Sequence, residues 1–103
     1  MARAKKLTWS PASQRDLLGI HSYYSRVASS EIADKLLLEI EVGALRLKTE
    51  PMMGPPRDEI SSGLHVIFVH PYSVFYRVQD NAVEISRIIH EERKPPSAEN
   101  FSD

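Results

Sequence analysis

The sequence predicts an α+β fold of two layers, in which a helical hairpin covers one face of an antiparallel sheet. Residues 11 to about 48 carry apolar side chains at helical spacing, whereas residues 64–90 carry them at the alternating spacing of strands. The segment TEPMMGPP, at 49–56, separates the two halves with three prolines and a glycine. Helices followed by a run of strands are typical of an α+β domain.

The first half is expected to form a short strand at about 4–9 and then two helices. Ser10 and Pro11 mark the start of the first helix, because serine caps the free amides of a first turn and proline there loses no hydrogen bond. We expect this helix to run from 11 to 27. The ASS segment at 28–30 then ends it and provides a serine cap for the second helix. Two helices joined by so short a link form a hairpin.

The second half is expected to form three strands joined by tight turns. Residues 64–69 are apolar on both faces, which predicts a central strand. The next strand ends near Val78, and the last runs from Val83 to about His90. The strands form a three- to four-stranded sheet with the N-terminal segment.

The predicted hairpin places charged side chains on strands that otherwise look like core. A two-residue turn at Asp80-Asn81 sets Arg77 opposite Glu84, where opposite charges stabilise a strand pair. The same register puts Arg87 on the helix-covered side, so its guanidinium needs a carboxylate, a chain end or the sheet edge as a partner. His90 is expected at the strand end on the uncovered side.

Composition narrows the possible functions. A chain of 103 residues with 42% hydrophobic residues is expected to form one domain, at 1–94, followed by a mobile tail at 95–103. There is no cysteine, no apolar run near the roughly 18 residues of a membrane span, and no histidine or carboxylate set at metal-ligand spacing. The net charge of −1 does not favour direct nucleic-acid binding. We therefore expect a cytoplasmic protein without metal or cofactor.

Several segments together resemble the ParE branch of the RelE/ParE toxin superfamily, the toxic halves of bacterial type II toxin–antitoxin pairs. The resemblance covers about residues 7–94 in order. Its motifs are WSPA at 9–12, PMMG at 51–54, RDE at 57–59, Gly63, YRV at 76–78 and the RIIH ending at 87–90. Each motif is short, but the ordered set is specific to the superfamily, which also implies the topology predicted above.

The resemblance implies two alternative activities. Members similar to RelE cleave messenger RNA on the ribosome, and members similar to ParE inhibit DNA gyrase without being nucleases. For a nuclease the candidate catalytic residues are His90, Arg57 and Arg77, since RNA cleavage needs an acid, a base and cations. However, Glu91 stands where such enzymes can carry tyrosine, and no tyrosine follows Tyr76. The sequence thus favours a non-enzymatic toxin that binds gyrase.

The resemblance also implies protein partners, namely a cognate antitoxin similar to ParD, in a hetero-oligomer, and DNA gyrase. Three apolar side chains off the buried stripes, Leu18, Tyr23 and Leu38, are candidates for an antitoxin-binding groove. The candidate gyrase-contacting residues lie near the last strand and are Arg87, His90, Arg93 and Lys94. A third hypothesis is a non-toxic member that only binds an antitoxin.

Overall fold

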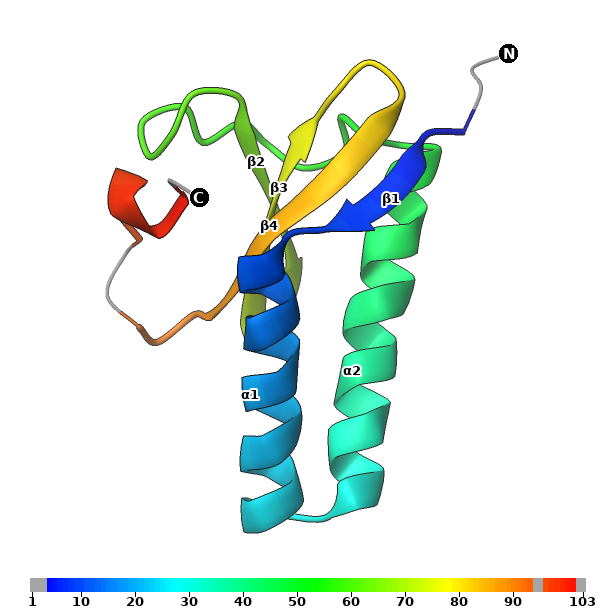
Figure 1. The fold of residues 1–103 in the computed structure, drawn as a ribbon, viewed down its shortest axis with the longest axis vertical. Helices are drawn as coiled ribbons and strands as arrows, with labels where there is room; N and C mark the ends of the chain where they lie inside the picture. The colour runs from blue at the N-terminus through cyan, green and yellow to red at the C-terminus, as the bar shows by residue number, and fades with distance from the viewer. Residues whose placement is uncertain (1–3, 94–95, 102–103) are drawn as a thin grey trace.

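The computed structural model describes residues 4–93 and 96–101 and has two layers (Figure 1). A helical hairpin covers one face of a four-stranded sheet, and a short C-terminal turn lies on the other. The predicted α+β fold is confirmed. The elements in chain order are β1 (Lys6–Trp9), α1 (Pro11–Val27), α2 (Ser30–Leu45), the 3-10 turn η1 (Arg46–Lys48), β2 (Leu64–Val69), β3 (Tyr72–Val78), β4 (Ala82–His90) and the 3-10 turn η2 (Ala98–Phe101).

Both helices begin at the serine caps that the sequence predicts. The Ser10 hydroxyl accepts a hydrogen bond from the Ser13 N–H at 3.0 Å, and Pro11 occupies the first helical position. The Ser29 hydroxyl accepts from the Ile32 N–H at 3.1 Å. Each cap satisfies an amide that the helix itself leaves without a partner, so the helix boundaries follow from local chemistry.

The strand order is β1-β4-β3-β2, and the three C-terminal strands are antiparallel as predicted. β1 joins them parallel to β4, with Lys6 opposite Ala82 and Trp9 opposite Ile85, so the whole sheet is mixed. β2 lies at an edge, and the prediction of a central strand at 64–69 is therefore wrong. Both faces of β2 are apolar because both are covered. One face packs in the hydrophobic core beneath the helices, and on the other face Leu64 and Val66 pack in a second hydrophobic cluster.

A β-bulge in β4 separates a correctly predicted part of the hairpin from an incorrectly predicted part. Arg77 lies opposite Glu84 and Tyr76 opposite Ile85, as expected. The next pair, however, joins Phe75 to Arg87, so Ser86 is an extra residue in β4. The Ser86 carbonyl accepts a hydrogen bond from the Ser10 hydroxyl at 2.8 Å, which ties the bulge to the start of α1.

The bulge reverses the faces of the residues that follow it, since one extra residue inverts the alternation of a strand. Arg87 was predicted on the helix-covered side, but it lies opposite Phe75, which packs in the cluster away from the helices. His90 was predicted on the uncovered side, but it lies opposite Tyr72, which packs in the helix-side core. Both predictions are wrong, and the correction moves His90 next to α1.

The second cluster includes part of the segment that was expected to form a mobile tail. Phe101, in η2, is buried, and its ring centroid is 5.1 Å from that of Phe75. Burying a side chain of this size stabilises a fold by roughly 1.5–3 kcal/mol. The face of the sheet opposite the helices is thus partly covered by the C-terminal segment (Figure 1).

Candidate functional site

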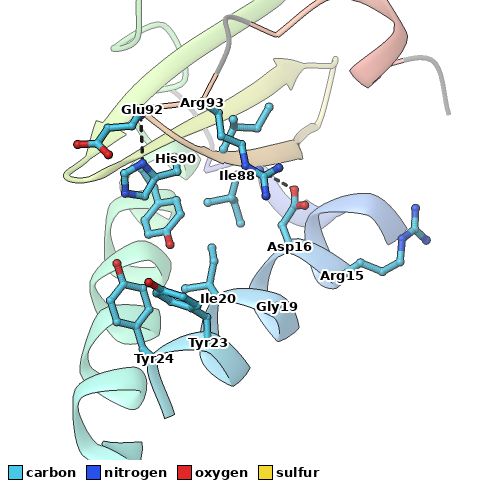
Figure 2. Close-up of a pocket in the computed structure, with 12 residues that line it drawn as sticks. Arg15, Asp16, Gly19, Ile20, Tyr23, Tyr24, Ile88, His90, Glu92 and Arg93 are labelled. Atoms are coloured by element: carbon cyan, nitrogen blue, oxygen red, sulfur yellow. Dashed lines mark hydrogen bonds between the residues drawn. The ribbon is translucent and has the colours of Figure 1, made fainter. Parts of the chain in front are cut away.

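A hollow of about 550 Å³ lies between α1 and the C-terminal end of β4 (Figure 2). Its walls come from one side of α1, from Tyr72 at the start of β3, and from the end of β4 with the residues after it. Two predicted target-binding residues, His90 and Arg93, line it together. Lys94 lies outside the described residues. Arg87 does not line the hollow but engages Asp16 at its wall.

Asp16 fastens α1 to β4 at this wall. Its carboxylate accepts hydrogen bonds from Arg87 Nε at 2.8 Å, from Arg87 Nη2 at 3.0 Å and from the Ile88 N–H at 2.8 Å. β1 pairs with β4 only as far as Ile85, so the carboxylate serves as the partner of the open strand edge beyond it. Arg87 has the carboxylate partner that its burial requires, and Asn100 O accepts a further bond from it at 3.3 Å.

Aromatic rings form the floor of the hollow. Tyr23 and Tyr24 meet edge to face with centroids 5.1 Å apart, and Tyr72 meets His90 in the same way at 5.2 Å. Figure 2 draws Tyr23 and Tyr24 next to each other on α1, below His90. Burial raises the pKa of Tyr72, and a hydrogen bond with Tyr24 raises it further. The Tyr72 hydroxyl is therefore protonated at neutral pH.

The chain leaving β4 holds His90 in a defined state. The Glu92 N–H donates to His90 Nδ1 at 3.0 Å, as drawn in Figure 2, so the neutral ring carries its proton on Nε2. The Arg93 N–H donates to the His90 carbonyl at 3.1 Å, which closes a turn directly after β4. The positive charge of Arg93 acts on the Tyr72 hydroxyl and favours its ionised form.

The three residues predicted for a nuclease do not come together. His90 lies opposite Tyr72 on the helix side, whereas Arg77 points to the other face. The two positions are five residues apart along β3, about 17 Å at the usual rise of a strand. Arg57 lies with Arg77, because its N–H donates to the carbonyl of Leu64, the residue opposite Arg77.

Both arginines are engaged locally. Arg57 Nε donates to Glu59 at 2.7 Å, and this hydrogen bond lowers the pKa of the Glu59 carboxyl. Arg77 lies opposite Glu84, but its guanidinium donates to the hydroxyls of Ser61 at 2.5 Å and Ser86 at 3.4 Å. These contacts connect the loop before β2 to the sheet.

The predicted antitoxin-binding residues are also separated. Tyr23 lines the hollow described above, while Leu18 is 72% exposed and lines neither this hollow nor the next. Leu38 lines a second concavity of about 640 Å³, which we call the α2–β2 groove. Its walls are mostly apolar, and they are formed by α2, by the loop before β2 and by the open edge of β2, with Val42 and Phe68 among the exposed side chains.

Sequence reasoning missed Asp16, Tyr24 and Tyr72 as parts of the site. A signal for Asp16 was present, since it lies four residues before the buried Ile20 and so on the inner side of α1. Within residues 4–93 and 96–101, no three His, Cys, Asp or Glu side chains are grouped to hold a metal ion. No helix among those residues has the length and apolar character that a membrane span requires.

One protein-family model and several solved structures are similar to this chain. A family model described as the ParE toxin of the type II toxin–antitoxin system parDE matches residues 7–95. A solved chain from the chromosomal ParDE toxin–antitoxin system of P. aeruginosa is similar with a TM-score of 0.76 and 23% identity, over 86% of this chain and 98% of that one. A chain from the RelBE2 toxin–antitoxin complex of Mycobacterium tuberculosis is similar with a TM-score of 0.61 and 22% identity, over 84% and 98%. No curated protein matches the chain significantly.

Proposed function

The chain belongs to the family of ParE toxins of type II toxin–antitoxin systems, and from this membership we propose that it inhibits DNA gyrase by binding, without cleaving nucleic acid. The separation of His90 from Arg77 and Arg57 supports this proposal most strongly. A nuclease must hold its acid, base and cations within hydrogen-bond reach of one phosphate, and these three side chains are distributed over two faces of the sheet.

The target surface that we propose is the rim of the hollow between α1 and β4, with His90 and Arg93 as contacts. Both line the same concavity. Lys94 follows directly in the chain and is proposed with them. Arg87 is proposed to act indirectly, since its pairing with Asp16 holds the end of β4 against α1.

The test uses purified toxin in two reactions. In one, gyrase acts on relaxed plasmid, and in the other, a cell-free translation reaction is analysed by primer extension on the messenger. We expect loss of supercoiling or accumulation of cleaved plasmid, with intact messenger. Three results together would establish the nuclease alternative: the toxin cuts the messenger, a His90→Ala variant no longer cuts it, and supercoiling remains normal.

We further propose that the antitoxin lays an apolar helix face into the α2–β2 groove. Leu38 and Val42, four residues apart on α2, are 60% and 50% exposed, and Phe68 across the groove is 61% exposed. An amphipathic helix presents apolar side chains at matching spacing. The toxin–antitoxin setting of the family supplies a protein partner for this apolar surface.

Charge introduced on α2 tests this placement. A Val42→Glu variant should bind the cognate antitoxin about thirtyfold more weakly or worse, because the contact loses apolar area and buries a carboxylate. The matched control is Leu18→Glu, on the exposed side of α1, which should bind as the wild type does. Isothermal titration calorimetry measures both. If Leu18→Glu bound the antitoxin more weakly and Val42→Glu did not, the antitoxin-binding site would lie on α1 instead.

A further inference from the structure

The outward face of α2 is complementary to itself under a two-fold rotation. We propose that the chain, in the absence of other proteins, forms a symmetric dimer through this face, with α2 of one copy antiparallel to α2 of the second. The two-fold axis passes beside Val42, and Glu39 of each copy lies opposite Arg46 of the other. In such a dimer a residue i that contacts a residue j is matched by a second contact of j with i.

Three apolar side chains on this face are open to solvent. Leu38 is 60% exposed, Val42 is 50% exposed and Leu45 is 51% exposed. They follow at positions i, i+4 and i+7, which is the spacing of one stripe along a helix. Because α1 packs against α2 on one side only, the stripe lies at the free side of the helical layer (Figure 1). Antiparallel helices bury stripes of this kind between them.

Two opposite charges flank the stripe on one side. Glu39 and Arg46 are exposed, both line the α2–β2 groove, and they lie seven residues apart, about 10.5 Å along the helix. Among the residues that the structure describes, neither side chain takes part in a hydrogen bond or an ion pair. Seven residues are close to two full turns, so both charges lie on the same side of Val42. They are therefore free to meet charges of a second copy.

The positions of these side chains fix the register of the dimer. Leu38 and Leu45 are centred half a residue before Val42. Glu39 and Arg46 are centred half a residue after it. An antiparallel copy turned about an axis at Val42 therefore sets the two leucines opposite each other on one flank. On the other flank it sets Glu39 opposite Arg46, and the symmetry repeats both contacts.

The same charges disfavour a parallel dimer. In a parallel pair in register, each Glu39 would face the other Glu39 and each Arg46 the other Arg46, and like charges in contact oppose association. The charge pattern thus selects the antiparallel arrangement. A contact made mainly by two helices is small, so we expect a dimer that forms and dissociates reversibly.

Sedimentation equilibrium of the purified full-length chain, at concentrations up to about 500 μM, tests the proposal. The wild type should form dimers. Glu39→Arg and Arg46→Glu should each weaken dimerisation about tenfold or more, because the symmetry sets like charges together at two places. An equimolar mixture of these two variants should form a one-to-one dimer as tight as that of the wild type, since every mixed contact again joins opposite charges.

The matched control is Glu41→Arg, the same charge change on the same helix. Glu41 lies seven residues after Asp34, which bonds His21 of α1, and so on the side of α2 towards α1. This variant should dimerise as the wild type does. Val42→Glu gives an independent second variant, because it sets two carboxylates together at the two-fold axis and should also weaken the dimer tenfold or more. Circular dichroism checks that each variant is folded.

Three results would overturn the inference. They are a wild-type chain that stays monomeric over the whole concentration range, a dimer that Glu39→Arg and Val42→Glu leave intact, and reversal variants that stay monomeric when they are mixed. The dimer does not depend on the proposed function, because the experiment uses this chain alone. Its failure would leave the gyrase and antitoxin proposals standing.

Discussion

Replacing Asp16 with alanine should destabilise the fold strongly, because three hydrogen bonds from α1 to β4 end on this one carboxylate. The side chains of Asp16 and Arg87 are only 15% and 20% exposed, so the change leaves a largely buried guanidinium without its main partner. Removing one member of a buried ion pair costs roughly 3–5 kcal/mol. Arg87 keeps its contact to the Asn100 carbonyl, which places the expected loss at about 3 kcal/mol, at the lower end of that range.

Urea unfolding followed by circular dichroism measures this free energy, and a thermal melt should show a fall in Tm of about 12–24 °C for a domain of this size. The matched control is Asp34→Ala. Asp34 bonds His21 at 2.7 Å across the helical hairpin, but its side chain is 73% exposed, so its loss should cost less than about 1 kcal/mol. Equal losses in the two variants would refute the assignment of Asp16 and Arg87 as the fastening of α1 to β4.

Further predictions concern the packing of the sheet and its tyrosines. Gly54→Ala should cost about 3 kcal/mol or more in urea unfolding, because the new methyl group would lie 2.2 Å from a backbone carbonyl oxygen of β2. Gly19→Ala, which meets nothing within 4 Å in the middle of α1, should instead stabilise by about 0.5–1 kcal/mol, and a loss there would contradict the helix geometry. Tyr76→Phe should cost about 1–3 kcal/mol, since the hydroxyl accepts from the Gly54 N–H and donates to a loop carbonyl; an unchanged denaturation midpoint would count against these bonds. Burial raises the pKa of Tyr72 and Tyr76, so both stay protonated in the fold while the unfolded chain ionises. The free energy of unfolding should therefore stay constant up to about pH 10 and decrease above it, by at most about 2.7 kcal/mol per pH unit for the two tyrosines. A free energy of unfolding that does not change above pH 10 would contradict this.

The sequence predicted the elements whose causes are local. The serine caps at Ser10 and Ser29 fix the starts of the helices, and the turn at Asp80-Asn81 fixes the first half of the last hairpin. These features depend on residues within a few positions of one another, so their chemistry is visible in the sequence. The family resemblance depended on such segments in a fixed order.

The part that sequence reasoning could not predict depends on contacts between distant residues. Ser86 is accommodated as a bulge because its carbonyl meets the hydroxyl of Ser10, which lies 76 positions earlier in the chain. That single insertion decides which faces Arg87 and His90 occupy, and alternation alone predicted the opposite faces. The parallel pairing of β1 with β4 and the burial of Phe101 likewise depend on tertiary packing.

In the candidate site, too, the residues near one strand end were predicted, whereas those brought in by distant contacts were not. His90 and Arg93 were identified as charged or titratable groups near a strand end, and they do line one hollow. The opposite wall comes from α1, about 70 residues earlier, and its Asp16 and Tyr24 were recognised only once the helix was placed against β4. Tyr23 and Leu38 line different concavities and Leu18 lines neither of the two, because side chains off a buried stripe need not share a surface.

A stoichiometric titration of supercoiling activity tests the proposal that this toxin acts by binding gyrase and not by catalysis. A known concentration of gyrase receives increasing toxin, alone or after incubation with the cognate antitoxin. We expect supercoiling activity to fall in proportion to the toxin added, to reach its minimum when every gyrase is occupied, and to be restored by antitoxin. Gyrase that remains fully active in a large excess of folded toxin would contradict it.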